Sequence, residues 1–166
     1  MELIKLLGWQ EIAVRLGSAV LIGALLGLNR ELRGKAAGLR TNALVCLGAA
    51  LFVLSAISLA TAQNEHRDVA AVSRVIQGIV TGIGFLGAGV ILRDTSGKRV
   101  HGLTTAAAIW LAAALGVLCG IGLWPVAAAG VVLTLFILVV GRPFEKLIHR
   151  HFPGLTEEDR DPRDHE

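Results

Sequence analysis

Polar and charged side chains gather where two pairs of long apolar segments are joined. They are Arg30, Glu31, Arg40, Thr41 and Asn42 around the first loop, and Arg93, Asp94, Thr104 and Thr105 around the second. Thr41 and Thr105 are suited to capping helix starts, which carry partial positive charge. Two helix starts beside Arg40 could receive an anion or the acidic group of a partner. Alternatively, the charges only mark the ends of the apolar segments and the threonines are ordinary caps.

A second polar group lies inside an apolar segment. Arg74, Gln77 and Thr81 are spaced i, i+3 and i+7, which places them on one face of a helix. In a transporter such a stripe could hold a substrate or relay protons. Alternatively, Arg74 extends toward the membrane surface and Gln77 hydrogen-bonds a neighbouring helix. Glu11 and Arg15, spaced i and i+4, are expected to form a surface ion pair of small energetic value.

Motifs for catalysis, metals and nucleotides either are missing or fail their structural context. The sequence contains no HExxH motif and no nucleophile elbow, so an enzyme is the least expected class. His149 and His151 would diverge on a helix, and we predict no metal site and no cofactor. Gly82, Gly84 and Gly87 match a dinucleotide-binding spacing, but they lie within an apolar segment and not after a strand. The basic residues are spread over several loops, which argues against nucleic acid as a partner.

Five apolar segments must position these residues. Hydrophobic residues make up 54% of the 166 positions and occur in long blocks. A bilayer core needs about 20 apolar residues in a helix. We therefore predict an all-α integral membrane protein in a lipid bilayer, with no removable signal peptide. The predicted transmembrane domain is 1–141, with helices over 12–28, 42–62, 70–92, 103–120 and 124–141.

The basic residues predict the orientation in the membrane. Segments 29–41, 93–101 and 142–166 hold 12 of the 16 Lys and Arg residues. By the positive-inside rule, these segments face the cytoplasm and the amino terminus lies outside. Residues 142–166 are then a short cytoplasmic tail. Its start, RPFEKLIHRHF, is predicted to form an amphipathic helix on the membrane surface.

The sequence contains an internal repeat. An offset of 64 positions aligns GLRTNALVCLGAALFVL, from Gly38, with GLTTAAAIWLAAALGVL, from Gly102, giving ten identities in seventeen. The first two predicted helices therefore correspond to the third and fourth. Because both hairpins run in the same direction, we predict a parallel repeat about an axis along the membrane normal. Chance similarity between two apolar helices is the alternative.

Glycine is frequent, with 20 residues, and several glycines are four positions apart. This small-xxx-small spacing lets membrane helices approach closely. We predict helix packing as the main role, and a break in the third helix beside a transport route is the alternative. The glycines concerned are Gly23, Gly27, Gly78, Gly82, Gly84, Gly87, Gly89, Gly116 and Gly120.

Three ordered segments resemble the signature segments of the MgtC/SapB family. They read LGLNRELRGKAAGLRTNALVCLGAALF, GIGFLGAGVILR and GLTTAAAIWLAAALG, and the resemblance covers about residues 12–140. It implies a bacterial inner-membrane protein linked to growth under magnesium limitation and, in pathogens, to survival inside phagocytes. The family motif commonly has Glu where this chain has Asn29, so its activity could differ. Some members carry an additional carboxy-terminal domain, for which the tail here is short.

The resemblance leaves two main functions open. The first is a non-enzymatic regulator whose cytoplasmic polar face or glycine-rich surface engages partner membrane proteins. The second is a transporter or channel for a small ion such as magnesium, with Arg74, Gln77, Thr81 and Asn42 along its route. A bare divalent cation would be expected to need carboxylates inside the membrane, and the sequence places Glu31 and Asp94 at the boundary. A structural scaffold that forms homo-oligomers is a third possibility.

Overall fold

The computed structural model describes residues 2–62, 69–91 and 102–151, with side chains over 7–61, 69–91 and 102–141. These ranges contain five helices and no strand. Each helix has a segment long and apolar enough to cross a membrane, as the sequence predicts. The chain is thus an all-α membrane protein. The helices are α1 (Glu2–Glu31), α2 (Leu39–Ala62), α3 (Val69–Ile91), α4 (Leu103–Ile121) and α5 (Trp124–His151).

Two helices extend furthest beyond their predicted boundaries. The first begins earlier than expected, at Glu2, and is interrupted at Gly8, whose φ of 71° and ψ of 157° are not helical. α5 continues without a break to His151, so RPFEKLIHRHF does not form a separate helix. Gly141 and Pro143 both lie within this continuous helix.

The predicted tight turn between α4 and α5 depends on Gly122. Its φ of 87° is left-handed, a conformation that glycine adopts without a Cβ clash. The N–H groups of Gly122 and Leu123 both donate to the carbonyl of Leu118, at 3.0 Å each. These bonds satisfy a carbonyl that the end of α4 would otherwise leave unpaired. Pro125 then lies in the first turn of α5, where it removes no helical hydrogen bond.

The chain forms two compact units, Met1–Val131 and Val132–Glu166, which divide within α5. In the second unit, Val132, Leu133, Phe136 and Ile137 are all exposed apolar side chains. Exposed aliphatic and aromatic residues over two helical turns suit contact with lipid tails. The first unit holds the candidate site.

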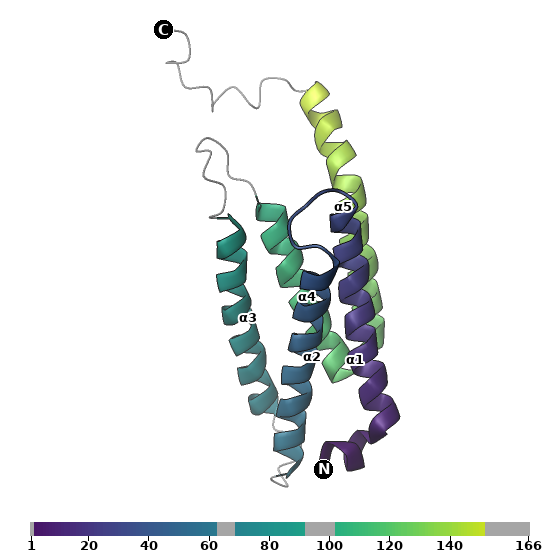
Figure 1. Cartoon of the computed structure of the whole chain (residues 1–166), viewed down its shortest axis with the longest axis vertical. Coiled ribbons are helices and arrows are strands. Elements are labelled where there is room, and N and C mark those ends of the chain that lie inside the picture. Colours follow the sequence, from purple (N-terminus) through teal and green to yellow (C-terminus); the bar gives the residue numbers. More distant parts are fainter. Residues whose placement is uncertain (1, 63–68, 92–101, 152–166) are drawn as a thin grey trace. The chain divides into compact units, whose positions relative to one another are not determined.

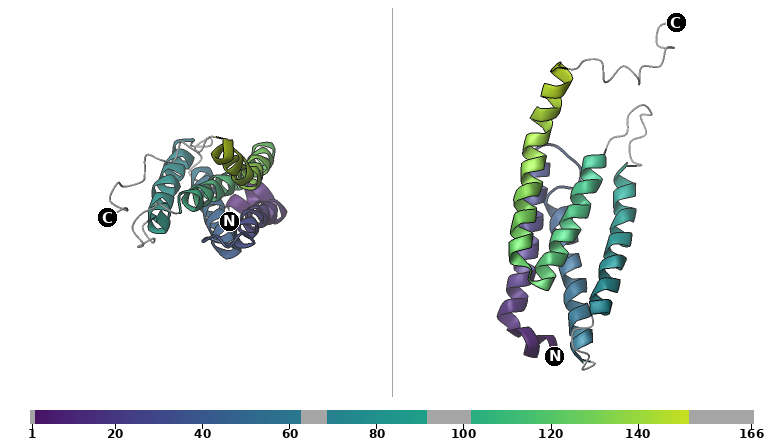
Figure 2. Two further views of the ribbon diagram at one scale, coloured as in Figure 1. Left: turned by 90° about the horizontal axis from the view of Figure 1, so that it is seen from above. Right: turned by 180° about the vertical axis from the view of Figure 1, so that it is seen from behind.

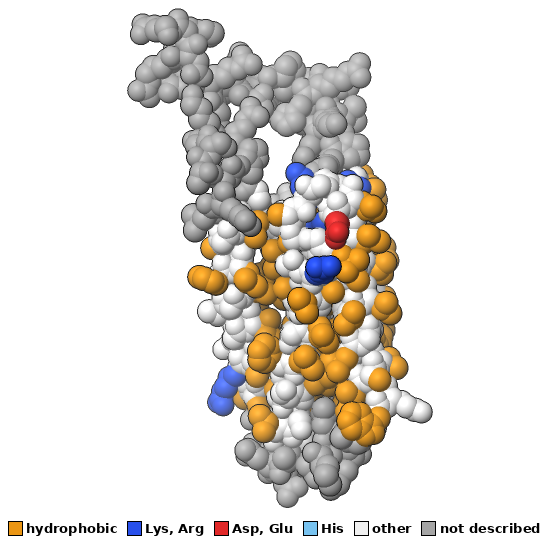
Figure 3. All heavy atoms as spheres, viewed as in Figure 1, with side chains coloured by type: hydrophobic (Ala, Val, Ile, Leu, Met, Phe, Trp, Pro, Cys, Tyr) orange, Lys and Arg blue, Asp and Glu red, His pale blue; other side chains and the backbone are white. Residues whose placement is uncertain are grey.

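α2 and α4 lie at the centre of the first unit. α2 contacts α1, α3 and α4, and α4 contacts α1, α2 and α3. Helices α1 to α4 run alternately in opposite directions (Figure 1). Seen along the helices, α3 lies at the edge of this group (Figure 2). Hydrophobic side chains cover the middle of the face drawn in Figure 3, as expected of a surface in lipid.

Four glycines, two on α1 and two on α4, allow these helices to approach α2 closely. A Cβ at Gly27 would lie 2.5 Å from the carbonyl oxygen of Gly38, and one at Gly23 would lie 2.5 Å from that of Asn42. Along α4, a Cβ at Gly116 would collide with the backbone of Cys46, and one at Gly120 would lie 2.9 Å from the carbonyl oxygen of Ala50. Backbones this close leave no room for any side chain at the four positions. Alanines and valines fill the adjacent core, at Ala49, Val53, Ala113 and Val117.

One contact recurs in both predicted hairpins. Gly23 of α1 lies against Asn42 of α2. In the second hairpin, Gly87 of α3 lies against Ala106 of α4, and a Cβ added at Gly87 would be 3.5 Å from the Cβ of Ala106. The two pairs are related by the offset of 64 residues. The first contact is closer than the second, and the internal repeat stays a prediction. The symmetry axis relating the hairpins stays a prediction.

Candidate functional site

A polar end cluster joins the ends of α1, α2 and α4. We define it as Arg30, Glu31, Asn42 and Thr105, which the sequence predicts at one face. Arg30 is in the last turn of α1 and only 3% exposed. Its Nη2 donates to the Thr105 hydroxyl of α4 and, at 3.3 Å, to the carbonyl of Ala36 in the loop. A buried cation therefore ties α1 to both the loop and α4.

Asn42 holds the same loop from the other side. Its side chain is fully buried in the first turns of α2. Nδ2 donates to the carbonyl oxygens of Ala37 at 2.6 Å and Gly38 at 3.0 Å. Ala37 has a φ of 57°, an uncommon value for a residue with a Cβ. Asn42 thus secures a strained turn of the loop.

The start of α2 is capped by Glu31 and not by Thr41. α2 begins at Leu39, whose N–H donates to Glu31 Oε2 at 2.9 Å. A carboxylate at a helix start is favoured by the helix dipole. Thr41 therefore lies inside the first turn and is exposed. The capping prediction for Thr41 is wrong because the helix starts three residues earlier than expected, at Leu39 and not at Asn42.

The same correction applies to α4. Its N-cap residue is Gly102, with a φ of 96° and no side-chain cap. Thr105 lies within the helix, 4% exposed, and its hydroxyl accepts from Arg30 instead of capping. Thr104 is exposed, and its backbone carbonyl lies 3.5 Å from Arg30 Nη1. Glu31 thus meets the start of α2, and Arg30 bonds acceptors in the first turn of α4.

The remaining predicted residues of this face have different surroundings. Arg40 is exposed on α2, and Lys35 is exposed in the preceding loop. Arg93 and Asp94 lie outside the described residues. The side-chain oxygens Oδ1 of Asn29 and Asn42 are buried, and the described residues give them no hydrogen-bond partner. The cluster consequently has a basic exposed rim, Lys35 and Arg40, beside the exposed carboxylate of Glu31, and a buried interior made of Arg30, Asn42 and Thr105.

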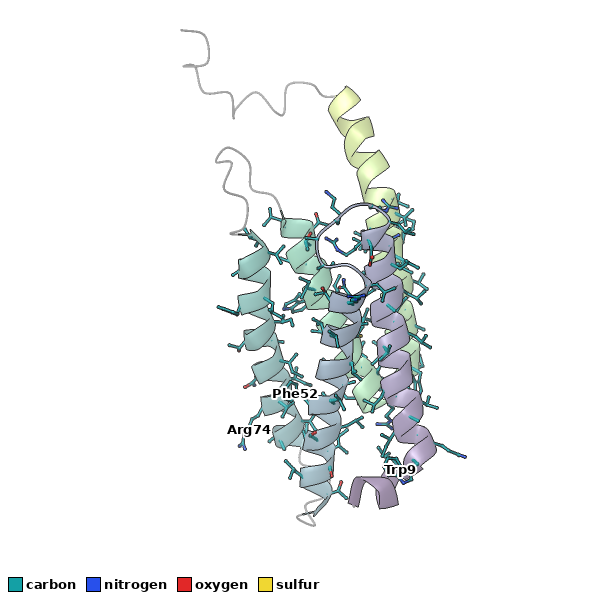
Figure 4. The ribbon with its side chains drawn as sticks, in the orientation of Figure 1. Trp9, Phe52 and Arg74 are labelled. Carbon is teal, nitrogen blue, oxygen red and sulfur yellow. The ribbon has the colours of Figure 1, made fainter. Side chains whose placement is uncertain are left out.

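The polar stripe on α3 lies on an exposed face. Arg74, Gln77 and Thr81 are all exposed, and Arg74 points away from the other helices (Figure 4). The Thr81 hydroxyl donates to the carbonyl of Gln77 in its own helix at 2.9 Å. The opposite face packs on the core through Ile76, Ile79 and Ile83. The structure brings the three residues together, as the spacing predicts, but not toward the centre of the helix group.

The glycines of α3 also differ from the packing prediction. A Cβ at Gly78, Gly82, Gly84 or Gly89 would meet no described atom within 4 Å. Only Gly87 of the α3 glycines lies against another helix. Gly78 and Gly82 instead line an apolar groove of about 630 Å³ between α2 and α3, whose other lining residues include Phe52 (Figure 4). The prediction fails there because α3 presents its isoleucines, and not these glycines, to its neighbours.

Arg15 has a structural role that sequence reasoning missed. Its side chain is 11% exposed and, besides the ion pair with Glu11 at 2.8 Å, donates to the carbonyls of Gly120 at 2.8 Å and Ile121 at 3.0 Å. These carbonyls end α4, where a cation is favoured. The spacing of Glu11 and Arg15 gave no signal of this contact, because it requires α1 to lie beside α4.

Cysteine and metal chemistry have little support in the described part of the chain. Cys46 and Cys119 are free and buried. Among the described residues, no group of three or more His, Cys, Asp or Glu side chains could hold a metal ion. The chemistry available at the polar end cluster is hydrogen bonding and charge pairing.

Comparison with known proteins places this arrangement in a family. Residues 16–147 match the model of the MgtC family. Protein SrpB of Synechococcus elongatus is 46% identical over 136 residues, which cover 78% of this chain and 74% of that protein. Protein MgtC of Salmonella typhimurium is 49% identical over 118 residues, covering 71% of this chain and 47% of that protein. Protein MgtC of Brucella abortus is 46% identical over 136 residues, which cover 82% of this chain and 52% of that protein.

The chain therefore spans about half the length of the two MgtC relatives and about three quarters of SrpB. No solved structure matches. The family match covers α2, α3 and α4 completely, and with them the loop that the polar end cluster holds. The chain belongs to the MgtC family.

Proposed function

We propose that this chain is a non-enzymatic regulator in the bacterial inner membrane that acts on other membrane proteins during adaptation to low magnesium. In a pathogen, the same role would serve intracellular survival. Membership of the MgtC family and relatives that carry the MgtC name support the link to magnesium. Much of each MgtC relative lies outside the matched region, so the activity of the whole relative is a proposal for this chain.

The position of the polar stripe on α3 is the observation that favours a regulator over a transporter. A route for an ion through the four-helix group would need polar side chains directed inward. Arg74, Gln77 and Thr81 face outward instead. The fourth predicted route residue, Asn42, is buried, but its amide donates to the carbonyls of Ala37 and Gly38 at the end of the helix group. At the centre, Gly23 and Gly116 bring backbones into contact, and the adjacent core is apolar. This packing favours a protein that presents surfaces over one that conducts ions.

The exposed rim of the polar end cluster is the surface proposed to meet a partner. Lys35 and Arg40 are exposed, and the described residues form no hydrogen bond with either side chain. The residues beneath them, Arg30 and Asn42, fix the loop that carries this rim. A rigid basic surface suits an acidic segment of a membrane protein at the cytoplasmic boundary. This surface faces the cytoplasm when the amino terminus lies outside, and that orientation is part of the proposal.

Ion flux is the experiment that separates regulator from transporter. Purified full-length protein is reconstituted in sealed liposomes with magnesium and proton indicators inside, and its insertion is verified by protease protection. We expect no flux above that of protein-free liposomes. Flux that disappears in Gln77→Leu but persists in Ser55→Leu would establish the transporter. Ser55 is the control because it is exposed on α2 and its hydroxyl bonds only its own helix, to Leu51.

Partner capture tests the surface itself. The tagged full-length chain is expressed at its normal level, crosslinked in cells and purified with its associated membrane proteins. Arg40→Glu should remove the specific associate, because it reverses a charge on the rim. Arg74→Glu is the matched control, since Arg74 is also an exposed arginine but lies on α3. Equal capture by wild-type protein and the Arg40 variant, at equal protein levels, would contradict the proposed surface.

A further inference from the structure

The outward face of α3 carries polar side chains and glycines, together with the exposed side chain of Phe85. We define the α3 outer face as Arg74, Gln77, Gly78, Thr81 and Gly82, which are all exposed. In α3, only Gly87 is buried, whereas α4 has ten buried residues. α3 is therefore the least enclosed helix of the first unit.

Lipid cannot satisfy this face. Hydrocarbon tails offer no hydrogen bonds, so a polar side chain turned toward them carries a free-energy cost. Thr81 avoids it by donating to its own helix. Arg74 is near the start of α3 and can extend to the headgroups. Gln77 lies one turn deeper, and its carboxamide forms no hydrogen bond with any described residue.

We propose that the α3 outer face is the site at which two copies of this chain pair in the membrane. A carboxamide carries both donors and an acceptor, so it is complementary to itself. Two copies inserted in the same orientation bring their Gln77 residues to the same depth, on either side of a two-fold axis along the membrane normal. The two amides then bond each other. A different membrane protein would need its own polar group at that depth.

The same face also has room for a second helix to approach closely. Gly78 and Gly82 are four residues apart and flank Gln77 and Thr81 on the helix surface. A Cβ at either glycine would meet nothing within 4 Å, so one copy leaves their surfaces open. The same two glycines line the groove between α2 and α3. A second α3 lying on this face would thus contact both the amide and the edge of this groove.

Self-association can be measured by energy transfer in liposomes. Full-length protein bearing Lys35→Cys is labelled with donor or acceptor dye, since the native cysteines are buried. Transfer is followed as the protein-to-lipid ratio falls. Wild-type protein should show specific transfer that fits a dimer. Gln77→Leu should raise the dissociation constant by about 3- to 30-fold, the range expected for interhelical hydrogen bonds in lipid, and Gln77→Asn should restore part of the affinity.

A matched glycine pair tests the contact surface. Gly78→Leu should weaken pairing at least as much as Gln77→Leu. Gly17→Leu is the control, because Gly17 on α1 is also exposed with no atom within 4 Å of an added Cβ. Oxidative crosslinking through Thr81→Cys should join two copies, whereas Leu51→Cys on α2 should not.

Three results would overturn the proposal. The first is wild-type protein that stays monomeric at the highest protein-to-lipid ratio. The second is a dimer that Gly17→Leu weakens as much as Gly78→Leu does. The third is an α3 face that crosslinks in native membranes only to a different protein. Pairing is independent of the regulatory role: loss of the Arg40-dependent partner would leave it unchanged, and a monomer could still bind that partner.

Discussion

Arg30 illustrates how one buried side chain can organise several backbone segments. It is 3% exposed and donates to Thr105 of α4 and to the loop carbonyl of Ala36. A buried guanidinium is costly unless its donors are matched, so each acceptor contributes more than an exposed one would. The energetic value of the cluster therefore depends on individual acceptors.

Thr105→Val tests this at the level of one hydroxyl. The change keeps the shape of the side chain and removes the acceptor for Arg30 Nη2. We expect the free energy of unfolding to fall by about 1.5 to 3 kcal/mol, the range for a hydrogen bond to a charged group. Thr41→Val is the control, since Thr41 occupies the equivalent repeat position but is exposed, and its effect should stay within about 0.5 kcal/mol. Unfolding in detergent by stepwise SDS addition gives both values.

At the scale of helices, polar contacts and glycine contacts act at different places. Arg15 of α1 meets the end of α4, and Gly116 of α4 meets the middle of α2. The first satisfies carbonyls that a helix end leaves unpaired, and the second permits dispersion contacts between backbones. α4 is thereby fixed at its end by α1 and along its length by α2.

Arg15→Leu should destabilise the protein by about 1.5 to 3 kcal/mol, because the carbonyls of Gly120 and Ile121 lose a charged donor. Glu11→Gln removes only the charge of the more exposed partner in the ion pair. It should lower the free energy of unfolding by less than about 0.5 kcal/mol. Thermal unfolding in detergent compares the two. Equal losses in both variants would mean that the ion pair, and not the helix end, gives Arg15 its importance.

Gly116→Ala and Gly48→Ala should differ in sign. A methyl at Gly116 collides with the backbone of Cys46, whereas one at Gly48 meets nothing within 4 Å. We expect a loss of about 1 to 3 kcal/mol for Gly116→Ala, as in overpacked cores. Gly48→Ala should instead gain up to about 1 kcal/mol, because alanine is the better helix former. The same SDS titration measures both, and destabilisation by Gly48→Ala would show that a further helix covers that surface.

For the whole molecule, the distribution of Lys and Arg leads to a test of orientation. Segment 29–41 is proposed to face the cytoplasm, and Trp9 at the other end of α1 to face outward (Figure 4). A membrane-impermeant maleimide should therefore label Lys35→Cys in inside-out vesicles and not in intact spheroplasts. Trp9→Cys should show the reverse pattern. Native Cys46 and Cys119 should not interfere, because both are fully buried.

The sequence by itself determined the class of the protein and the approximate positions of its helices. Five lipid-length apolar segments need no partner to be recognised, since each helix satisfies its own backbone hydrogen bonds in a membrane. The predicted spans 12–28, 42–62, 70–92, 103–120 and 124–141 each overlap a helix of the structure. The family followed as well, from three short segments that the comparisons confirm.

Only the tertiary structure decided what individual polar residues and glycines do. Gly23 and Gly78 share the same four-residue spacing pattern in the sequence, yet one contacts α2 and the other is open. Thr41 and Thr105 occupy the same repeat position, but only Thr105 is buried against Arg30. Spacing along a helix fixes which residues share a face, but not which neighbour that face meets. In lipid that choice depends on how closely the backbones pack, and this is a property of several helices together.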